Sequence, residues 1–210
     1  MHTKPNSMKQ ILPSILVVFG LNVAALAAPQ TFNFKDPKGV NNAVFKLDAP
    51  LEAINGSATG ISGTVKFDPE NPAATTGKIA ISSASLHVGN PMMNQHLHSD
   101  KWMDVAKFPE ISFDATALKN AKTEGNVTTA DATGKFTVKG VSKDLTIPVK
   151  ITYLKGKLGQ RVPNLNGDLL VIRSNFQIKR GDFGINPGQM EEKVSDAIDL
   201  TLSIAGASPQ

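Results

Sequence analysis

The nine residues LTIPVKITY, at positions 145–153, show which type of structure the chain is built from. The odd positions are apolar or aromatic and the even positions are polar or proline, which is the period of a β-strand with one buried face. At about 3.4 Å per residue, such a strand is about 30 Å long. Pro148 lies on the polar face and has no backbone N–H, which predicts an edge or a bulge on one side of this strand. The stretch therefore predicts an antiparallel sheet with one face against a core.

The same alternation recurs along the rest of the chain, between turn and loop residues. About eight such strands with one apolar face each are compatible with a barrel or a sandwich. We expect an all-β fold in the form of an antiparallel β-barrel, because several strands are long for a sandwich core and a closed barrel leaves no exposed edge. The other alternating segments are residues 43–48, 61–67, 79–81, 111–117, 136–138, 175–180 and 198–204, and Lys139-Gly140 marks a turn.

One short segment, NPMMNQHLHSDKW at positions 90–102, breaks this alternation. Asn90 can cap a helix and Pro91 suits the first helical position. Met93, His96 and Leu97 then follow at the spacing i, i+3, i+4 and share one helical face. A single short helical insert between strands is expected to cover one end of the barrel.

The N-terminal region has the pattern of a signal peptide. Two lysines precede an apolar run at residues 11–26, and small residues suit cleavage before Ala28. A retained membrane anchor is the alternative, but the run contains proline, glycine and asparagine and lacks a stop-transfer flank. We expect residues 1–27 to be a cleaved signal peptide and residues 28–210 to form a single exported domain with no stable membrane span.

The composition excludes several classes of function. The 22 Lys+Arg are interspersed with 18 Asp+Glu, so no basic run is present and we expect no nucleic-acid partner. The chain has no cysteine, and an exported domain without disulfides must be stabilised by burial. No ligand spacing for a metal surrounds His87, His96 or His98, and no Gly-x-Ser-x-Gly motif occurs, so we assign no metal, no cofactor and no catalytic residue. A barrel enzyme with His96 as general base is an alternative, as is a packed barrel without a ligand.

Arg180 is unusual because period-2 counting places it on the same strand face as Phe176 and Ile178. A guanidinium that faces an apolar interior is costly unless it is paired. Three interpretations remain open at this point. Arg180 could form an internal ion pair, it could lie in solvent where the strand ends, or it could hold the anionic head of a long apolar ligand at the mouth of a cavity.

Several motifs together resemble the signature of the YceI-like family. This likeness runs from Asp36 to Ile204 and implies a lipocalin-like barrel, exported to the bacterial periplasm, whose cavity holds a polyisoprenoid or another long-chain amphiphile. Members of this family are binding proteins with no established reaction and are often homodimers. The matching motifs are NQHLHS at 94–99, WMDV at 102–105, FPEISF at 108–113, GKFTVKGVSK at 134–143 and RGDFGI at 180–185.

The resemblance and the alternation together give a set of candidate ligand-binding residues. Its members are apolar or aromatic side chains on the inward strand faces and on the helical insert, with one histidine and one arginine. Met93-Asn94 stands where the family has an Arg-Asp pair, so the insert carries fewer charges than the family pattern. The candidates are Met93, His96, Leu97, Trp102, Phe108, Phe113, Phe136, Ile147, Ile151, Phe176, Ile178, Arg180 and Phe183.

Overall fold

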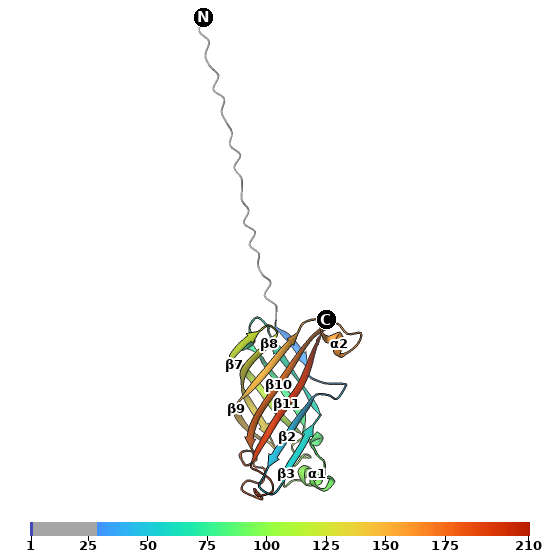
Figure 1. The fold of residues 1–210 in the computed structure, drawn as a ribbon, viewed down its shortest axis with the longest axis vertical. Helices are drawn as coiled ribbons and strands as arrows, with labels where there is room; N and C mark the ends of the chain where they lie inside the picture. Colours follow the sequence, from blue (N-terminus) through green and yellow to red (C-terminus); the bar gives the residue numbers. More distant parts are fainter. Residues whose placement is uncertain (2–28) are drawn as a thin grey trace.

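The chain forms a closed antiparallel β-barrel in a computed structural model, which describes Met1 and residues 29–210 (Figure 1). Apart from Met1, the predicted signal peptide lies outside the described residues. The helices are α1 Pro91–His98 and α2 Leu158–Arg161, with single helical turns at η1 Pro72–Ala74, η2 Ser83–Ser85 and η3 Arg180–Phe183. The strands are β1 Gln30–Asn33, β2 Asn42–Asp48, β3 Ala53–Ala58, β4 Ile61–Phe67, β5 Thr76–Ser82, β6 His87–Val88, β7 Glu110–Glu124, β8 Val127–Val138, β9 Val141–Leu154, β10 Gly167–Lys179 and β11 Ala197–Pro209.

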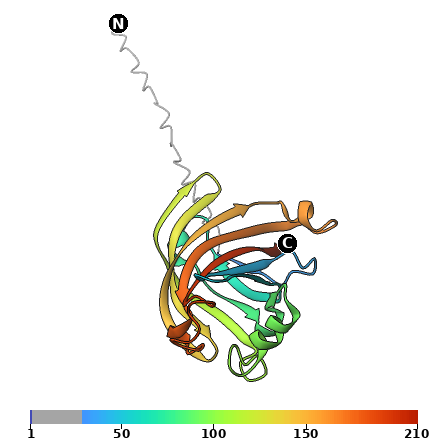
Figure 2. The same ribbon diagram turned by 60° about the horizontal axis from the view of Figure 1, so that its bottom comes forward.

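Eight strands close the ring in the order β1-β4-β5-β7-β8-β9-β10-β11, and β1 pairs with β11 at Asn33 and Ala207. Figure 2, in which the end that carries α1 comes forward, shows the strands arranged around a central axis. The predicted barrel of about eight strands is therefore confirmed. The strands β2, β3 and β6 extend the wall from the other half of β11, which pairs with β2 over residues 199–203.

The strand that contains residues 145–153 behaves as its alternation predicts. Ile147 and Ile151 are buried, and the ladder between β8 and β9 continues through Pro148. On its other side, the ladder between β9 and β10 ends at the pair Lys150–Arg173. The predicted edge at Pro148 is thus confirmed, and the Ser174 hydroxyl donates to the Pro148 carbonyl oxygen at 2.6 Å across the unpaired region.

The turn predicted at Lys139-Gly140 joins β8 to β9. Both residues have positive φ values, 47° and 75°, as a two-residue hairpin loop of type I′ requires. A Cβ atom on Gly140 would lie 2.5 Å from the ring of Phe108, so glycine is needed here for space as well as for conformation.

The barrel has two ends that differ in structure. We call the end that carries α2 and β1 the α2 end. The opposite end is the α1 end, and it consists of α1, the connection 99–109 and the loop 184–196. Figure 1 shows α1 and α2 at opposite ends of the strands. Buried apolar residues form one cluster towards each end, and Phe32 and Leu170 of the cluster at the α2 end are 0% exposed.

Backbone and side-chain hydrogen bonds hold the chain together at the α2 end. The Asn41 amide donates to the carbonyl oxygens of Phe34 and Ala205 at 3.0 and 3.1 Å. The Arg161 guanidinium lies 3.1 Å from the Asp36 carboxylate, which also accepts the backbone N–H of Asn41. These contacts join segments that lie 164 positions apart in the sequence. Among the described residues, no helix is long and apolar enough to cross a membrane.

Candidate functional site

The barrel encloses a cavity of about 900 Å³. This volume is at the upper end of the ~300–1,000 Å³ that small-molecule sites usually have. Its walls are predominantly apolar and aromatic, and its residues come from α1 and from every strand except β1. The presence of this cavity argues against the alternative of a barrel packed with its own side chains.

The helix α1 covers part of the cavity, as the sequence predicts. The Asn90 side-chain oxygen accepts the backbone N–H groups of Met92 and Met93 at 2.9 and 3.2 Å, which caps the first turn. The Asn94 side chain accepts the backbone N–H of Val88 at 2.7 Å and so ties α1 to β6. With α1 held in this way, its residues Met93 and Leu97 line the cavity.

The two histidines of α1 point to different surroundings. His96 lines the cavity together with Met93 and Leu97, whereas His98 Nε2 lies 2.7 Å from the Leu86 carbonyl oxygen. His87 Nδ1 is 2.9 Å from the Asn94 amide nitrogen. In residues 29–210, no three His, Cys, Asp or Glu side chains come close enough to hold a metal ion together.

Eleven of the thirteen predicted residues line the cavity, and the wall contributes most of them. Phe136 is central, because its ring centroid lies 6.4 Å from that of Phe113 and 5.9 Å from that of Phe176. The eleven are Met93, His96, Leu97, Trp102, Phe113, Phe136, Ile147, Ile151, Phe176, Ile178 and Arg180.

Phe108 and Phe183, by contrast, are not among the residues that line the cavity. Phe183 is 2% exposed and packs edge-on against Phe136 with 5.6 Å between ring centroids, behind the cavity wall. The reason is that η3 begins at Arg180, where the period of β10 ends. Phe108 covers Gly140, and the Lys107 ammonium lies 5.2 Å from its ring centroid.

Arg180 adopts neither the internal ion pair nor the solvent exposure that the sequence left open. Its side chain is 0% exposed, and its guanidinium carbon lies 5.6 Å from the centroid of the Trp102 ring. All five of its N–H donors have backbone carbonyl partners in the loop 184–196. The accepting residues are Ser195 at 3.2 Å from Nε, Ile185 at 2.8 Å from Nη1, Asn186 with the same nitrogen, Gln189 with Nη2, and Val194 at 3.0 Å from Nη2.

The carbonyls that surround Arg180 belong to a segment without a strand ladder. Buried backbone carbonyls need donors, and in this loop a single guanidinium supplies several of them. Arg180 therefore holds the loop 184–196 against the barrel and fixes one side of the α1 end. Its donors are already used, so binding an anionic head group at this residue would require some of these hydrogen bonds to break.

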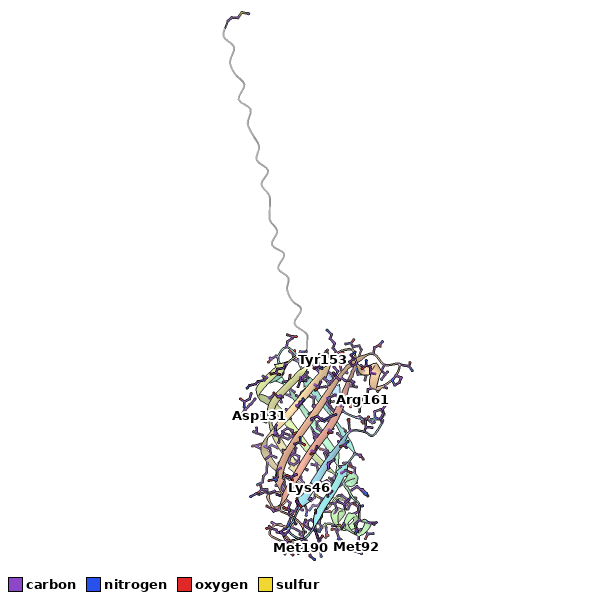
Figure 3. All side chains as sticks on the ribbon, viewed as in Figure 1. Lys46, Met92, Asp131, Tyr153, Arg161 and Met190 are labelled. Atoms are coloured by element: carbon purple, nitrogen blue, oxygen red, sulfur yellow. The ribbon has the colours of Figure 1, made fainter. Side chains whose placement is uncertain are left out.

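Polar and exposed residues surround the cavity at the α1 end. Met92 and Met190 both lie at this end of the molecule, whereas Tyr153 and Arg161 lie towards the opposite end (Figure 3). The backbone N–H of Leu51 donates to the Glu192 carbonyl oxygen at 2.9 Å, which links the β2–β3 connection to the loop 184–196. Polar and charged residues that line the cavity in these segments and in the connection after α1 are Glu52, Ser99, Lys101 and Lys193.

Other lining residues did not enter the sequence-based set. Phe45 and Leu47 lie on the apolar face of an alternating segment, so their pattern could have included them. Ile54, Ile185 and Val194 also line the cavity, but β3 and the loop 184–196 show no alternation that would reveal it. Their contribution depends on how the loops fold back over the barrel.

Comparisons with known proteins agree with this geometry. A family model described as YceI-like domain matches residues 36–205. The curated protein YceI of Salmonella arizonae is 28% identical over 153 residues, which are 73% of each chain. The crystal structure of the Campylobacter jejuni YCEI protein is similar with a TM-score of 0.59 and 26% identity, over 74% of this chain and 85% of that one.

A more distant structure shares the fold. It is a polyisoprenoid binding domain from Saccharophagus degradans, with 11% identity and a TM-score of 0.62, over 86% of this chain and 99% of that one. The family model spans nearly all of the described barrel, from the residues after β1 to the last strand. The chain therefore belongs to the YceI-like domain family.

Proposed function

We propose that this protein binds a long-chain lipid, a polyisoprenoid or another long amphiphile, inside the barrel and carries or sequesters it without chemical change. The observation that carries this proposal is the apolar cavity of about 900 Å³ beneath α1. Apolar ligand surface buried there would contribute about 25 cal/mol per Å². Met93 supplies a flexible side chain that can adapt to tails of different shape.

The likeness to other proteins supports a lipid as the ligand. The Saccharophagus degradans domain is named as polyisoprenoid binding, and it shares the barrel fold with this chain. Because identity to that domain is 11%, the choice between a polyisoprenoid and another long amphiphile rests on this chain's own cavity. That cavity favours an apolar tail and has its charged lining residues at the α1 end.

We propose that the protein acts after export to the periplasm. The pattern of residues 1–27 supports a cleaved signal peptide, and residues 28–210 would then be the single mature domain. The complete absence of cysteine fits a domain that relies on its two apolar clusters in an oxidising compartment. Assembly into a homodimer stays a prediction from the family resemblance.

The arrangement around His96 favours binding over catalysis. His96 lines the cavity together with the apolar side chains of Met93, Leu97 and Trp102. A general base acts best with a positioned partner that orients it or takes up charge. The enzymatic alternative requires turnover of a bound lipid that His96→Ala abolishes while binding persists.

The test is to purify the mature protein from its own periplasm without detergent and to measure the mass of the intact complex, followed by solvent extraction. We expect one long-chain lipid per cavity. An unliganded mass that stays unchanged after incubation with prenyl and fatty lipids would overturn the proposal. Chemical conversion of the extracted lipid by the purified protein would instead support the enzymatic alternative.

A further inference from the structure

The cavity wall carries few charged groups, and two of them are lysines at the α1 end. Lys101 follows α1 in the connection 99–109, and Lys193 lies in the loop 184–196. Both side chains line the cavity while their residues are exposed to solvent. A lysine can place its aliphatic chain along an apolar wall and keep its ammonium in water, which suits the boundary between a tail and a head group.

These lysines are available to a ligand in a way that Arg180 is not. The guanidinium of Arg180 already donates to five backbone carbonyls. Within residues 29–210, by contrast, neither Lys101 nor Lys193 forms an ion pair with an acidic side chain. Lys139 donates to the backbone carbonyls of Asp100 and Lys101 at 3.1 and 3.4 Å, so it fixes the turn that presents Lys101.

The acidic groups nearby do not cancel this charge at the cavity itself. Glu52 is the acidic side chain among the described residues that line the cavity. Asp100, Glu191 and Glu192 are sequence neighbours of the two lysines but do not line it. The lining of the α1 end therefore has two exposed cations and one exposed anion.

We propose that Lys101 and Lys193 bind the anionic head group of the ligand, a carboxylate or a phosphate monoester, while its apolar tail lies between Phe136 and Ile151. This inference rests on the proposed lipid-binding function and adds the chemical class of the head group. Ammonium groups act as mobile point charges, so the site accepts head groups of different shape. Because the site is exposed, its contribution is modest and depends on salt.

The chain offers a direct readout of binding. Trp102 is its single tryptophan and lines the cavity, so its fluorescence reports occupancy without a label. The probes are geranylgeranyl monophosphate and geranylgeraniol, which differ in the charged group, and palmitate and hexadecanol as a second pair. The two pairs distinguish a phosphate from a carboxylate as the preferred head group.

The variant that tests the proposal carries Lys101→Gln and Lys193→Gln together. We expect affinity for the charged member of at least one pair to fall about five- to tenfold, and affinity for the alcohols to stay unchanged. Lys107→Gln is the matched control, because this lysine lies in the same connection over Phe108 and does not line the cavity. Raising salt to about 1 M should remove the preference in the unaltered protein, since the Debye length is then about 3 Å.

The outcomes separate this inference from the proposed function. Equal affinity of the unaltered protein for both members of each pair overturns the inference and leaves lipid binding intact. An equal loss of charged and neutral lipids in the double variant also overturns it, because the lysines would then act through the shape of the cavity. Failure of all four probes to bind overturns the proposed function and this inference together.

Discussion

The two ends of the barrel differ in how their buried polar groups find hydrogen-bond partners. At the α2 end, partly or fully buried side chains pair with one another as well as with the backbone: Tyr153 donates to the Asp168 carboxylate at 2.7 Å, and Arg161 pairs with Asp36 at 3.1 Å. At the α1 end, Arg180 pairs with backbone carbonyls of a loop. The α2 end is thereby closed by contacts between distant segments, and the α1 end is closed by a loop and a short helix over a cavity.

This contrast suggests a division of tasks within the barrel. Contacts that join β1, β10 and α2 should determine stability of the whole domain, because many strands depend on them. Contacts of α1 and of the loop 184–196 should determine how the cavity is shaped and how a ligand enters. Arg180 should affect both the stability of the domain and the shape of the cavity, because it is fully buried and also forms part of the cavity lining.

The largest effect is expected from Arg180→Met. Loss of the guanidinium leaves several buried carbonyls of the loop 184–196 without a donor, and we expect the free energy of unfolding to fall by about 3–5 kcal/mol. Affinities for neutral and acidic lipids should fall together, because the change alters the cavity and not a head-group contact. Urea unfolding followed by Trp102 fluorescence measures the first effect, and titration with both lipids measures the second.

The matched control is Arg173→Met on β10, the strand that ends just before Arg180. Arg173 is exposed, and its Nη1 donates to the carbonyls of Ile172 and Ile204 at 3.2 and 3.3 Å. We expect a change of about 1 kcal/mol or less. Selective loss of acidic lipids in Arg180→Met, with stability preserved, would show that Arg180 binds the head group after all.

The second largest effect is expected at the α2 end, where the stability of the fold should depend on pH. Burial raises the pKa of the Tyr153 hydroxyl, and its hydrogen bond to Asp168 raises it further, to about 12. Burial alone would also raise the pKa of Asp168, but hydrogen bonds from the Gly156 N–H and from Tyr153 lower it below its ordinary value of 3.8. The pair is therefore most stable with Tyr153 neutral and Asp168 ionised.

Two pH windows follow from these shifts. Ionised Asp168 stabilises the fold above its ordinary pKa, and this contribution is lost as the pH falls through its lower folded pKa. Neutral Tyr153 stabilises the fold below pH 10, and this contribution is lost as the pH rises towards 12. Tyr153→Phe should cost about 1–3 kcal/mol at neutral pH and should flatten the alkaline limb of stability measured by urea unfolding. An unchanged alkaline limb would contradict this assignment.

The sequence predicts the regular elements of the barrel much better than its loops. Strands, helix caps and tight turns each require particular residue types at fixed positions. The alternation at residues 145–153, the cap at Asn90 and the turn at Lys139-Gly140 therefore appear in the structure as predicted. The edge at Pro148 is visible for the same reason, because the missing N–H is a local property of proline. Most cavity-lining residues on the strands follow from the same period.

The features that the sequence analysis missed lie where the side chains show no periodic pattern. The partners of Arg180 are carbonyls, which every residue has, so no residue type in the loop 184–196 marks them. Phe183 lies outside the cavity lining because β10 gives way to η3 at Arg180, which side-chain alternation does not show. Strand β3 has Gly56 opposite Phe45, and a Cβ at Gly56 would lie 2.0 Å from that ring, so the strand omits an apolar residue where alternation would need one.

A smaller effect is expected at the α1 end from Asn90→Ala. The change leaves the N–H groups of Met92 and Met93 without their cap and should cost about 1 kcal/mol, confined to the first turn of α1. Because α1 covers the cavity, a bound lipid should dissociate several-fold faster while global unfolding changes little. Stopped-flow fluorescence of Trp102 measures the dissociation rate.

Asn175→Ala is the control for this prediction. Asn175 lies on the outer face of the barrel wall and accepts a hydrogen bond from Thr201 at 2.8 Å, so it loses a comparable contact far from α1. Equal acceleration of lipid release in both variants would show that general loosening of the barrel, and not the cap of α1, controls release.

The smallest effect is expected from Glu52→Gln, which tests how charged residues that line the cavity at the α1 end influence affinity for an anionic lipid. Glu52 lines the cavity beside the segment that carries Lys193, and its carboxylate repels an anionic head group. Glu52→Gln should therefore raise affinity for geranylgeranyl monophosphate about two- to threefold and leave geranylgeraniol unchanged, since exposed charges each contribute little. Glu124→Gln, in the β7–β8 hairpin at the opposite end, changes net charge equally and should have no effect. If both variants raise the affinity alike, the overall charge of the protein attracts the ligand; if only Glu52→Gln does so, recognition of the anion is local to this cavity.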